Sequence, residues 1–306
     1  MESPTSHQHE ECFSLLDIAR KKLKSDDGFS GYLHAVTGVL AVQLIFLVGL
    51  LMGWGQQFAT VGSLALVVAF ALALIGATLY PDLDNSKSTS HSALGFVGEG
   101  ISFVFRATSS LIQVVVRTPK DDASPNPHRG FYHTTLSAVL IGLGVWQLTR
   151  ISLPVELPFL GEISLGRVFA IIFLGTMILL MLSALAKSRM KKIRGIALVG
   201  ELVAFAISVV VASLLLSFIP APAHGDLWLG IAIAAGGFVH ILGDTFTRYG
   251  TPIFFPLAVF TKKRFWWYTR FGRIESGGEV EKIIVWVCLG LSLLIFLFCI
   301  GKVFLF

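Results

Sequence analysis

Three short polar motifs hold most of the residues in this chain that could bind a metal ion. They are PDLD at residues 81–84, HRGFYH at residues 128–133 and HILGDTFTRYGTP at residues 240–252. The sequence around them is strongly apolar, and a charge placed centrally in a bilayer helix costs about 2.5–3.5 kcal/mol on insertion scales. Histidine and aspartate at such positions therefore indicate a functional role, and both residue types bind zinc, manganese or iron.

The first motif places two carboxylates close together in the sequence. Pro81 disfavours helix at the residue before it, so we expect the second apolar helix to end there and the chain to continue extended. In an extended chain Asp82 and Asp84 point in the same direction, which favours a cation between them. A solvated turn, with an aspartate capping a helix, is the alternative.

The third motif places a histidine and an aspartate on one face of a helix. His240 and Asp244 are four residues apart, so both side chains can reach the same ion. We expect Gly250 and Pro252 to end this helix, and Arg248 to lie in the loop at the same face. A capped helix end with a hydrogen-bonded histidine is the alternative.

The second motif combines two histidines with an arginine. His128 and His133 are five residues apart, about 140° around an ideal helix, so they would diverge if both were helical. We expect His128 in the loop and His133 on the first helical turn. Arg129, between them, can neutralise a phosphate or a carboxylate. A fourth histidine, His34, opens the first apolar helix, as a ligand or as an interfacial side chain.

The composition excludes a soluble globular domain. Hydrophobic residues make up 54% of the chain, charged residues 14%, and the mean hydropathy is +0.76. Apolar segments long enough to cross a bilayer predict an all-α polytopic membrane protein with about seven transmembrane helices. We place them at roughly 33–54, 60–80, 133–150, 166–186, 196–219, 228–247 and 283–305. The segment 94–116 contains Glu99 and Arg106, so we expect an interfacial or re-entrant helix, with a further span as the alternative.

The rest of the chain adds little chemistry. Residues 1–30 lack the apolar core of a signal peptide, so we expect a cytoplasmic polar tail followed by a single transmembrane domain at 31–306. Three cysteines without a CxxC motif indicate neither a disulfide framework nor a thiolate zinc site. The net charge of +5 is explained by basic loops on one side of a membrane, so no nucleic-acid partner is expected.

The distribution of basic residues predicts which helix ends share a side. Lys and Arg cluster at residues 20–24, 187–194 and 262–273, whereas residues 53–59, 151–165 and 220–227 contain none. Alternating these loops predicts an inner-membrane protein with a cytoplasmic N-terminus. The three motifs and His34 then all fall at the cytoplasmic ends of their helices, whereas His224 falls in an outside loop. We therefore predict one site, at the cytoplasmic face.

The motifs supply nitrogen and oxygen ligands without sulfur. The predicted ligands of the metal are His34, Asp82, Asp84, His128, His133, His240 and Asp244. This set is sufficient for one or two divalent ions, with zinc expected first and manganese or iron as alternatives. Carboxylate-rich sets of this kind are typical of hydrolytic sites, where the metal lowers the pKa of bound water.

The motifs also carry a family resemblance. The segments PDLDNSKS, HRGFYHTTL and HILGDTFTRYGTPIFFP resemble the bacterial LexA-regulated, membrane-bound, metal-dependent hydrolases, the YdjM-like family. His34 matches an early helix-opening histidine, and GGEVEK at residues 277–282 is similar to a stretch before the final helix of that family. The likeness covers roughly residues 31–300. Two features depart from it: Tyr132 stands where threonine is frequent, and the loop over residues 85–127 is long.

The resemblance implies a membrane-embedded metal-dependent hydrolase. The expected substrate has a phosphoester or related bond and is a lipid or another membrane-associated anion. His128, His133 and Asp84 are the predicted catalytic residues, and the predicted contacts of the anionic group are Arg129, Arg248 and Lys87. The alternative is a non-catalytic metal-binding membrane protein: a transporter, a sensor or a structural subunit.

Overall fold

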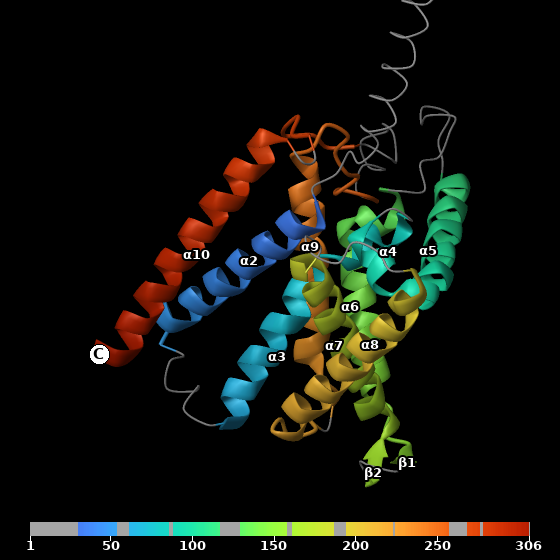
Figure 1. The fold of residues 1–306 in the computed structure, drawn as a ribbon, viewed down its shortest axis with the longest axis vertical. Helices are drawn as coiled ribbons and strands as arrows, with labels where there is room; N and C mark the ends of the chain where they lie inside the picture. The colour runs from blue at the N-terminus through green and yellow to red at the C-terminus, as the bar shows by residue number, and fades with distance from the viewer. Residues whose placement is uncertain are drawn as a thin grey trace, which may run out of the picture.

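The computed structural model describes residues 30–53, 61–85, 88–116, 129–157, 161–186, 194–222, 224–256, 268–275 and 278–305. With the labels of Figure 1, the first half contains α2 (Gly31–Leu51), α3 (Val61–Ala77), the 3-10 helix η2 (Tyr80–Asp84), α4 (Thr89–Ala93) and α5 (Gly95–Val115). The second half contains the 3-10 helix η3 (Phe131–His133), α6 (Thr135–Thr149), β1 (Pro154–Leu157), β2 (Gly161–Ser164), α7 (Leu165–Ala186), α8 (Arg194–Ser217), α9 (Leu227–Thr245) and α10 (Glu279–Leu305).

The fold is that of an all-α polytopic membrane protein, as the sequence predicts. Within the described ranges, six helices are long and apolar enough to cross a membrane: α2, α3, α7, α8, α9 and α10. The seventh expected span, α6, is apolar but has 15 residues, fewer than the roughly 20 that a bilayer requires. It is short because η3 and the cap residue Thr134 occupy the start of the predicted helix. The segment 94–116 forms α5, which is not among the six.

The two ends of the bundle differ in what they carry (Figure 1). The hairpin of β1 and β2 and the connection from α8 to α9 lie at the lower end of the view, whereas α9 runs upward to its C-terminus. The hairpin falls in a loop predicted without secondary structure, and its antiparallel register pairs Pro154 with Ser164. The loops without basic residues at 151–165 and 220–227 therefore share one end, as predicted, whereas residues 54–59 of the third such loop lie outside the described residues.

Glycines bring the helices of the core close together around α9. A Cβ at Gly236 would lie 2.4 Å from the Leu74 carbonyl oxygen on α3, and one at Gly230 would lie 2.5 Å from the Gly142 carbonyl oxygen on α6. Helices in a membrane associate by this kind of close backbone packing, because lipid provides no hydrophobic driving force between them. The position of α9, which carries the third motif, is thereby fixed against two neighbours.

Candidate metal centre

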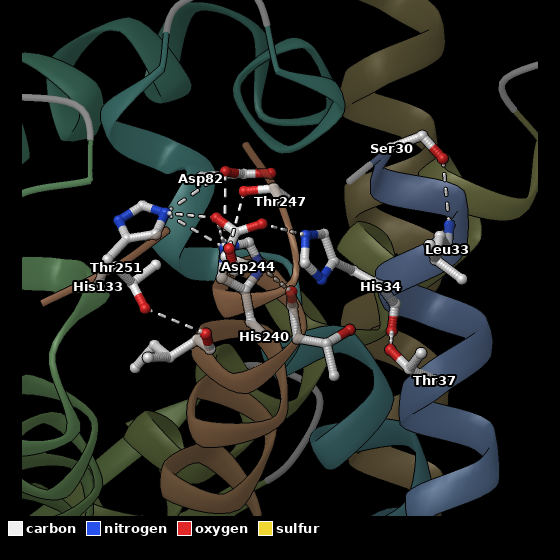
Figure 2. Close-up of polar contacts among 12 residues, drawn as sticks. Ser30, Leu33, His34, Thr37, Asp82, His133, His240, Asp244, Thr247 and Thr251 are labelled. Atoms are coloured by element: carbon white, nitrogen blue, oxygen red, sulfur yellow. Dashed lines mark hydrogen bonds and ion pairs between the residues drawn. The ribbon is translucent and has the colours of Figure 1, made fainter. Parts of the chain in front are cut away.

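The predicted ligands that lie in the described ranges converge at one end of the bundle, where four elements meet (Figure 2). They come from the first turn of α2, from η2, from η3 and from the last turns of α9, and are His34, Asp82, Asp84, His133, His240 and Asp244. Five of these side chains are 0–1% exposed, whereas Asp82 is 15% exposed. Residues far apart in the sequence thus form one buried polar cluster.

The PDLD motif forms the 3-10 helix η2, so our prediction of an extended chain was wrong. Pro81 lies at the start of this helix, where a missing N–H has no helical partner to lose. With three residues per turn, side chains two positions apart diverge. Asp82 accordingly faces His240, whereas Asp84 lies beside the opposite edge of the His133 ring. The two carboxylates therefore do not converge on one point.

Close packing seats η2 on α9. A Cβ at Gly237 would lie 2.2 Å from the hydroxyl oxygen of Tyr80, the first residue of η2. A larger residue at position 237 would displace the Tyr80 ring, which packs on the helical turn before His240. Gly237 therefore lets the first side chain of η2 lie directly on α9.

A backbone carbonyl fixes the orientation of His240. Its Nδ1 lies 2.7 Å from the carbonyl oxygen of Thr78. A carbonyl can only accept a hydrogen bond, so Nδ1 carries the proton and Nε2 presents its lone pair to the cluster. Histidines that bind metals are commonly oriented in this way by a hydrogen bond from the second ring nitrogen.

Four atoms define the centre of the cluster: Nε2 of His133, Nε2 of His240, Oδ1 of Asp82 and Oδ2 of Asp244. The two nitrogens are 3.2 Å apart. Each carboxylate oxygen lies 3.7 Å from Nε2 of His133 and 3.6 Å from Nε2 of His240. Figure 2 shows the two aspartates and both rings pointing toward one another.

These separations fit a divalent ion. Ligand atoms at about 2.0–2.2 Å from a tetrahedral ion lie about 3.3–3.6 Å apart, close to the separations among His133, His240 and Asp82, which form one candidate group. The donor set of two imidazoles and two carboxylates suits zinc, manganese and iron. Anionic oxygens and a nitrogen lone pair facing one another in a buried space gain favourable energy when a cation joins them. The residues present therefore fit the implied metal.

His34 forms a second candidate group that shares residues with the first. Its Nε2 lies 3.4 Å from Oδ1 of Asp244, and its ring stacks on that of His240 with centroids 3.8 Å apart. His34, His240 and Asp244 could also hold an ion. Because both groups use His240, and because its Nδ1 is bonded to Thr78, both cannot be complete at once. Asp244, with one oxygen toward each group, links them.

Asp84 lies behind His133 rather than among the four central atoms. Its Oδ2 is 3.6 Å from Nδ1 of His133, while Nε2 of that ring faces the centre. Burial lowers the pKa of His133, but Asp84 and Asp82 outweigh it and raise that pKa to about 9 in the metal-free protein. A carboxylate in this place orients the ring and makes it a more basic ligand.

Arg129 is buried against the loop that follows α9. Its Nη1 donates to Oγ1 of Thr247 at 2.7 Å and to the carbonyl oxygen of Gly250 at 3.3 Å, and Nη2 lies 3.5 Å from Oδ2 of Asp244. Its backbone has a φ of 63°, a conformation that costs a non-glycine residue roughly 1–3 kcal/mol. The strained backbone and the contacts with the loop hold this guanidinium, and with it Asp244, in place.

The start of α2 is tied to α10. The Ser30 side chain caps α2 by accepting from the Leu33 N–H at 3.3 Å, and the Ser30 N–H donates to Oε1 of Glu281 at 3.0 Å. Glu281 belongs to the GGEVEK stretch and lies in the first turn of α10. This contact fixes the helical turn from which His34 projects.

The remaining predicted residues lie elsewhere. His128 and Lys87 are outside the described residues. Arg248 is exposed, with its guanidinium 5.9 Å from the ring centroid of Tyr249. His224 precedes α9 at its N-terminal end, opposite to the cluster, where its carbonyl accepts from Trp146.

Two residues that position the site could not be recognised from the sequence. The Thr78 carbonyl orients His240, but any residue type supplies a carbonyl at that place. Ser109 accepts a hydrogen bond from the Phe131 N–H at 3.0 Å and so anchors the turn that carries His133. A serine in a moderately apolar segment predicts no such contact.

The chain was compared with known proteins and families. The family model described as YdjM inner membrane protein matches residues 30–303, nearly the whole chain. No curated protein and no solved structure matches it.

Proposed function

Since the chain belongs to the YdjM inner membrane protein family, we propose that it is a membrane-embedded, metal-dependent hydrolase. The proposed substrate has a phosphoester or related bond and is a lipid or another membrane-associated anion. The observation that carries the proposal is the group of His133, His240 and Asp82, whose donor atoms lie 3.2–3.7 Å apart, with Oδ2 of Asp244 3.6–3.7 Å from both histidine nitrogens. The basic loops further support a cytoplasmic site, with the N-terminus on the same side.

We assign the metal ligands to His133, His240, Asp82 and Asp244. Zinc is the first choice, with manganese or iron as alternatives. When bound, such an ion supplies Lewis acidity and activates water for attack on the substrate. Asp82 is the ligand with 15% of its side chain exposed, so the substrate approaches on its side of the cluster.

The surrounding residues hold protons and charges. Asp84 keeps Nδ1 of His133 protonated, so that Nε2 faces the centre. His34, with Nε2 3.4 Å from Asp244, can hold a proton at that atom and release it toward the leaving group. Arg129 keeps the Asp244 carboxylate ionised and in place.

The proposal is tested by metal analysis and a substrate panel on the full chain in lipid nanodiscs. Purified protein should contain a stoichiometric divalent metal, and chelation should abolish the hydrolysis of phosphoester lipids. Asp82→Asn should lose both metal and activity, whereas His224→Asn at the opposite end should retain both. Metal-free wild type, or hydrolysis that continues after complete removal of the metal, would contradict the proposal.

A specific observation favours a second candidate, a non-catalytic metal centre. Three of the four proposed ligands are 0–1% exposed, and structural metal sites are typically closed by four protein ligands. Under this alternative, removal of the metal lowers the thermal stability of the protein, and no phosphoester is hydrolysed. Bound metal without turnover across the whole panel would favour the structural centre.

A further inference from the structure

The helix α5 has an inverted distribution of polar and apolar residues. Its exposed side chains include Val97, Phe103, Val104, Leu111, Val114 and Val115, each at least 55% exposed. Its buried positions include three polar residues, Ser102, Ser109 and Gln113. A helix on the surface of a soluble protein has the opposite arrangement, with the apolar stripe facing the core. The outer face of α5 is therefore built for an apolar solvent.

The buried polar stripe of α5 packs against the elements of the metal centre. Ser109 accepts from the Phe131 N–H at 3.0 Å, and the ring of Phe105 stacks on Tyr132 with centroids 3.9 Å apart. Phe131 and Tyr132 belong to η3, whose last residue is His133. α5 also packs against η2, the element that carries Asp82. One helix thus separates the candidate site from whatever covers its apolar face.

The start of α5 contacts a candidate membrane span, α8. A Cβ at Gly95, the first residue of α5, would lie 1.9 Å from Oε2 of Glu201 on α8. Next to that contact α8 exposes Leu202, at 61%, and Phe205, at 37%. Because α8 is one of the six candidate spans, its exposed apolar side chains face lipid. α5 therefore begins beside a lipid-facing span, and its own exposed side chains are likewise apolar.

We infer that α5 is the lipid-facing wall of the metal centre, and that the substrate is a bilayer lipid whose acyl chains lie on the apolar face of α5. This inference rests on the proposed hydrolase function. The headgroup reaches the site at Asp82, the ligand with 15% of its side chain exposed, while the chains stay in hydrocarbon. In support, the buried Ser102 hydroxyl has no hydrogen-bond partner in the described part of the chain, so it can donate to a headgroup oxygen. The substrate never has to leave the membrane.

Two equally exposed leucines provide a matched pair for testing whether the outer face of α5 lies in lipid. Leu111 on α5 and Leu294 on the span α10 are both 64% exposed. In the full chain in nanodiscs, with the natural cysteines replaced, a spin label at each position should collide frequently with oxygen and rarely with a nickel chelate. Frequent collision with nickel at position 111 would overturn the inference, because the face would be in water. Protection from both reagents at that position would overturn it too, because another protein would cover the face.

A second measurement tests the substrate class. Wild type should hydrolyse a long-chain phosphoester lipid with a higher kcat/KM than its short-chain, water-soluble analogue. In Leu111→Gln the ratio of kcat/KM for the long-chain lipid to that for the analogue should fall about fourfold for each methylene of lipid contact that is lost. In Leu294→Gln this ratio should stay at the wild-type value. Equal preference in both variants would overturn the inference. If the wild type contained no metal and hydrolysed neither substrate, the proposed function and the substrate class would both be overturned. The spin-label result would still decide whether α5 faces lipid.

Discussion

The two ends of the bundle each bury an ion cluster, but the clusters are built differently. At the end opposite to the metal centre, Asp226 receives a hydrogen bond from Nε1 of Trp228 at 2.9 Å and lies 3.7 Å from Nη1 of Arg167. The Asp226 N–H donates to Oγ1 of Thr149 at 2.9 Å, and Nη2 of Arg167 donates to the carbonyl oxygen of Ile219 at 2.6 Å. This cluster joins α6, α7, α8 and α9 at their ends.

At the metal centre the Asp244 carboxylate has fewer hydrogen bonds. Within the described residues, neither oxygen of Asp244 accepts a hydrogen bond, although His34, His133, His240 and Arg129 surround it at 3.4–3.7 Å. Burying an anion without hydrogen bonds costs free energy, unless a cation compensates. The Asp226 cluster matches one carboxylate with one guanidinium, whereas the described part of the metal centre sets three carboxylates, Asp82, Asp84 and Asp244, beside the guanidinium of Arg129. The comparison indicates that the Asp226 cluster is balanced by itself, whereas the excess of carboxylates at the metal centre favours a further positive charge.

Asp244→Ala should give the largest loss of metal affinity and so distinguish most clearly between the two ends of the bundle. It removes a ligand of the proposed ion, so affinity should fall by more than the roughly 10–100-fold typical of an outer-shell change. The metal-free protein should also lose some stability, because the buried Arg129 guanidinium loses its carboxylate partner and keeps only its bonds to Thr247 and Gly250. Metal content and thermal unfolding are measured side by side for wild type and variant. Full metal content in the variant would remove Asp244 from the ligand set.

Asp226→Ala should lower stability at the opposite end without any loss of metal. Removing one partner of a buried ion pair costs roughly 3–5 kcal/mol, and the lower end applies here because Arg167 keeps its carbonyl partners and is 13% exposed. The free energy of unfolding should fall by that amount, whereas the metal affinity should stay at the wild-type value. A loss of metal without a loss of stability would show that the two ends are coupled and the comparison is wrong.

Asp84→Asn tests the carboxylate behind His133. The amide is nearly isosteric but has no charge, so it should weaken metal binding by about 10–100-fold without abolishing it. Isothermal titration of the metal-free protein gives the affinity. An effect as large as that of Asp244→Ala would mean that Asp84 is itself a ligand.

The pH dependence of metal binding should follow the same histidine. The pKa of His133 is raised to about 9 in the metal-free protein, above its usual value near 6.5. Its proton stabilises the metal-free fold fully below about pH 6.5, and this contribution is lost as pH rises through about 9. Because the metal must displace that proton, affinity should fall about tenfold for each pH unit below 9. Asp84→Asn should shift the start of this fall to lower pH, and an unchanged profile would contradict the assignment.

Much of the site could be predicted from the sequence because its residues stand at the ends of apolar segments. His34, His240 and Asp244 interrupt or border hydrophobic runs, and alternation of the spans places them at one end. The spacing of His240 and Asp244 also predicts their shared helix face, since four residues make about one turn.

The remaining features depend on tertiary packing. The different directions of Asp82 and Asp84 follow from a 3-10 helix that Pro81 begins, whereas proline is equally compatible with an extended chain. Arg129 could be placed near the site but not assigned to Asp244, because its partners Thr247 and Gly250 lie more than a hundred residues away. The inverted faces of α5 could not be recognised without knowing which side packs against η3.

The smallest effect is expected at the start of α2. Ser30→Ala removes the N-cap contact with the Leu33 N–H, a change that costs about 1 kcal/mol of stability. His34 lies one turn further along and contacts Asp244. Fraying of the helix start should therefore weaken the contact between His34 and Asp244. We therefore expect a small loss of stability together with a severalfold loss of turnover at unchanged metal content, because His34 is assigned to proton transfer. The control is Thr37→Ala, since Thr37 donates to the His34 carbonyl oxygen without capping the helix. If Ser30→Ala instead released the metal, His34 would be a ligand, and the centre would extend from the first group of residues into the second.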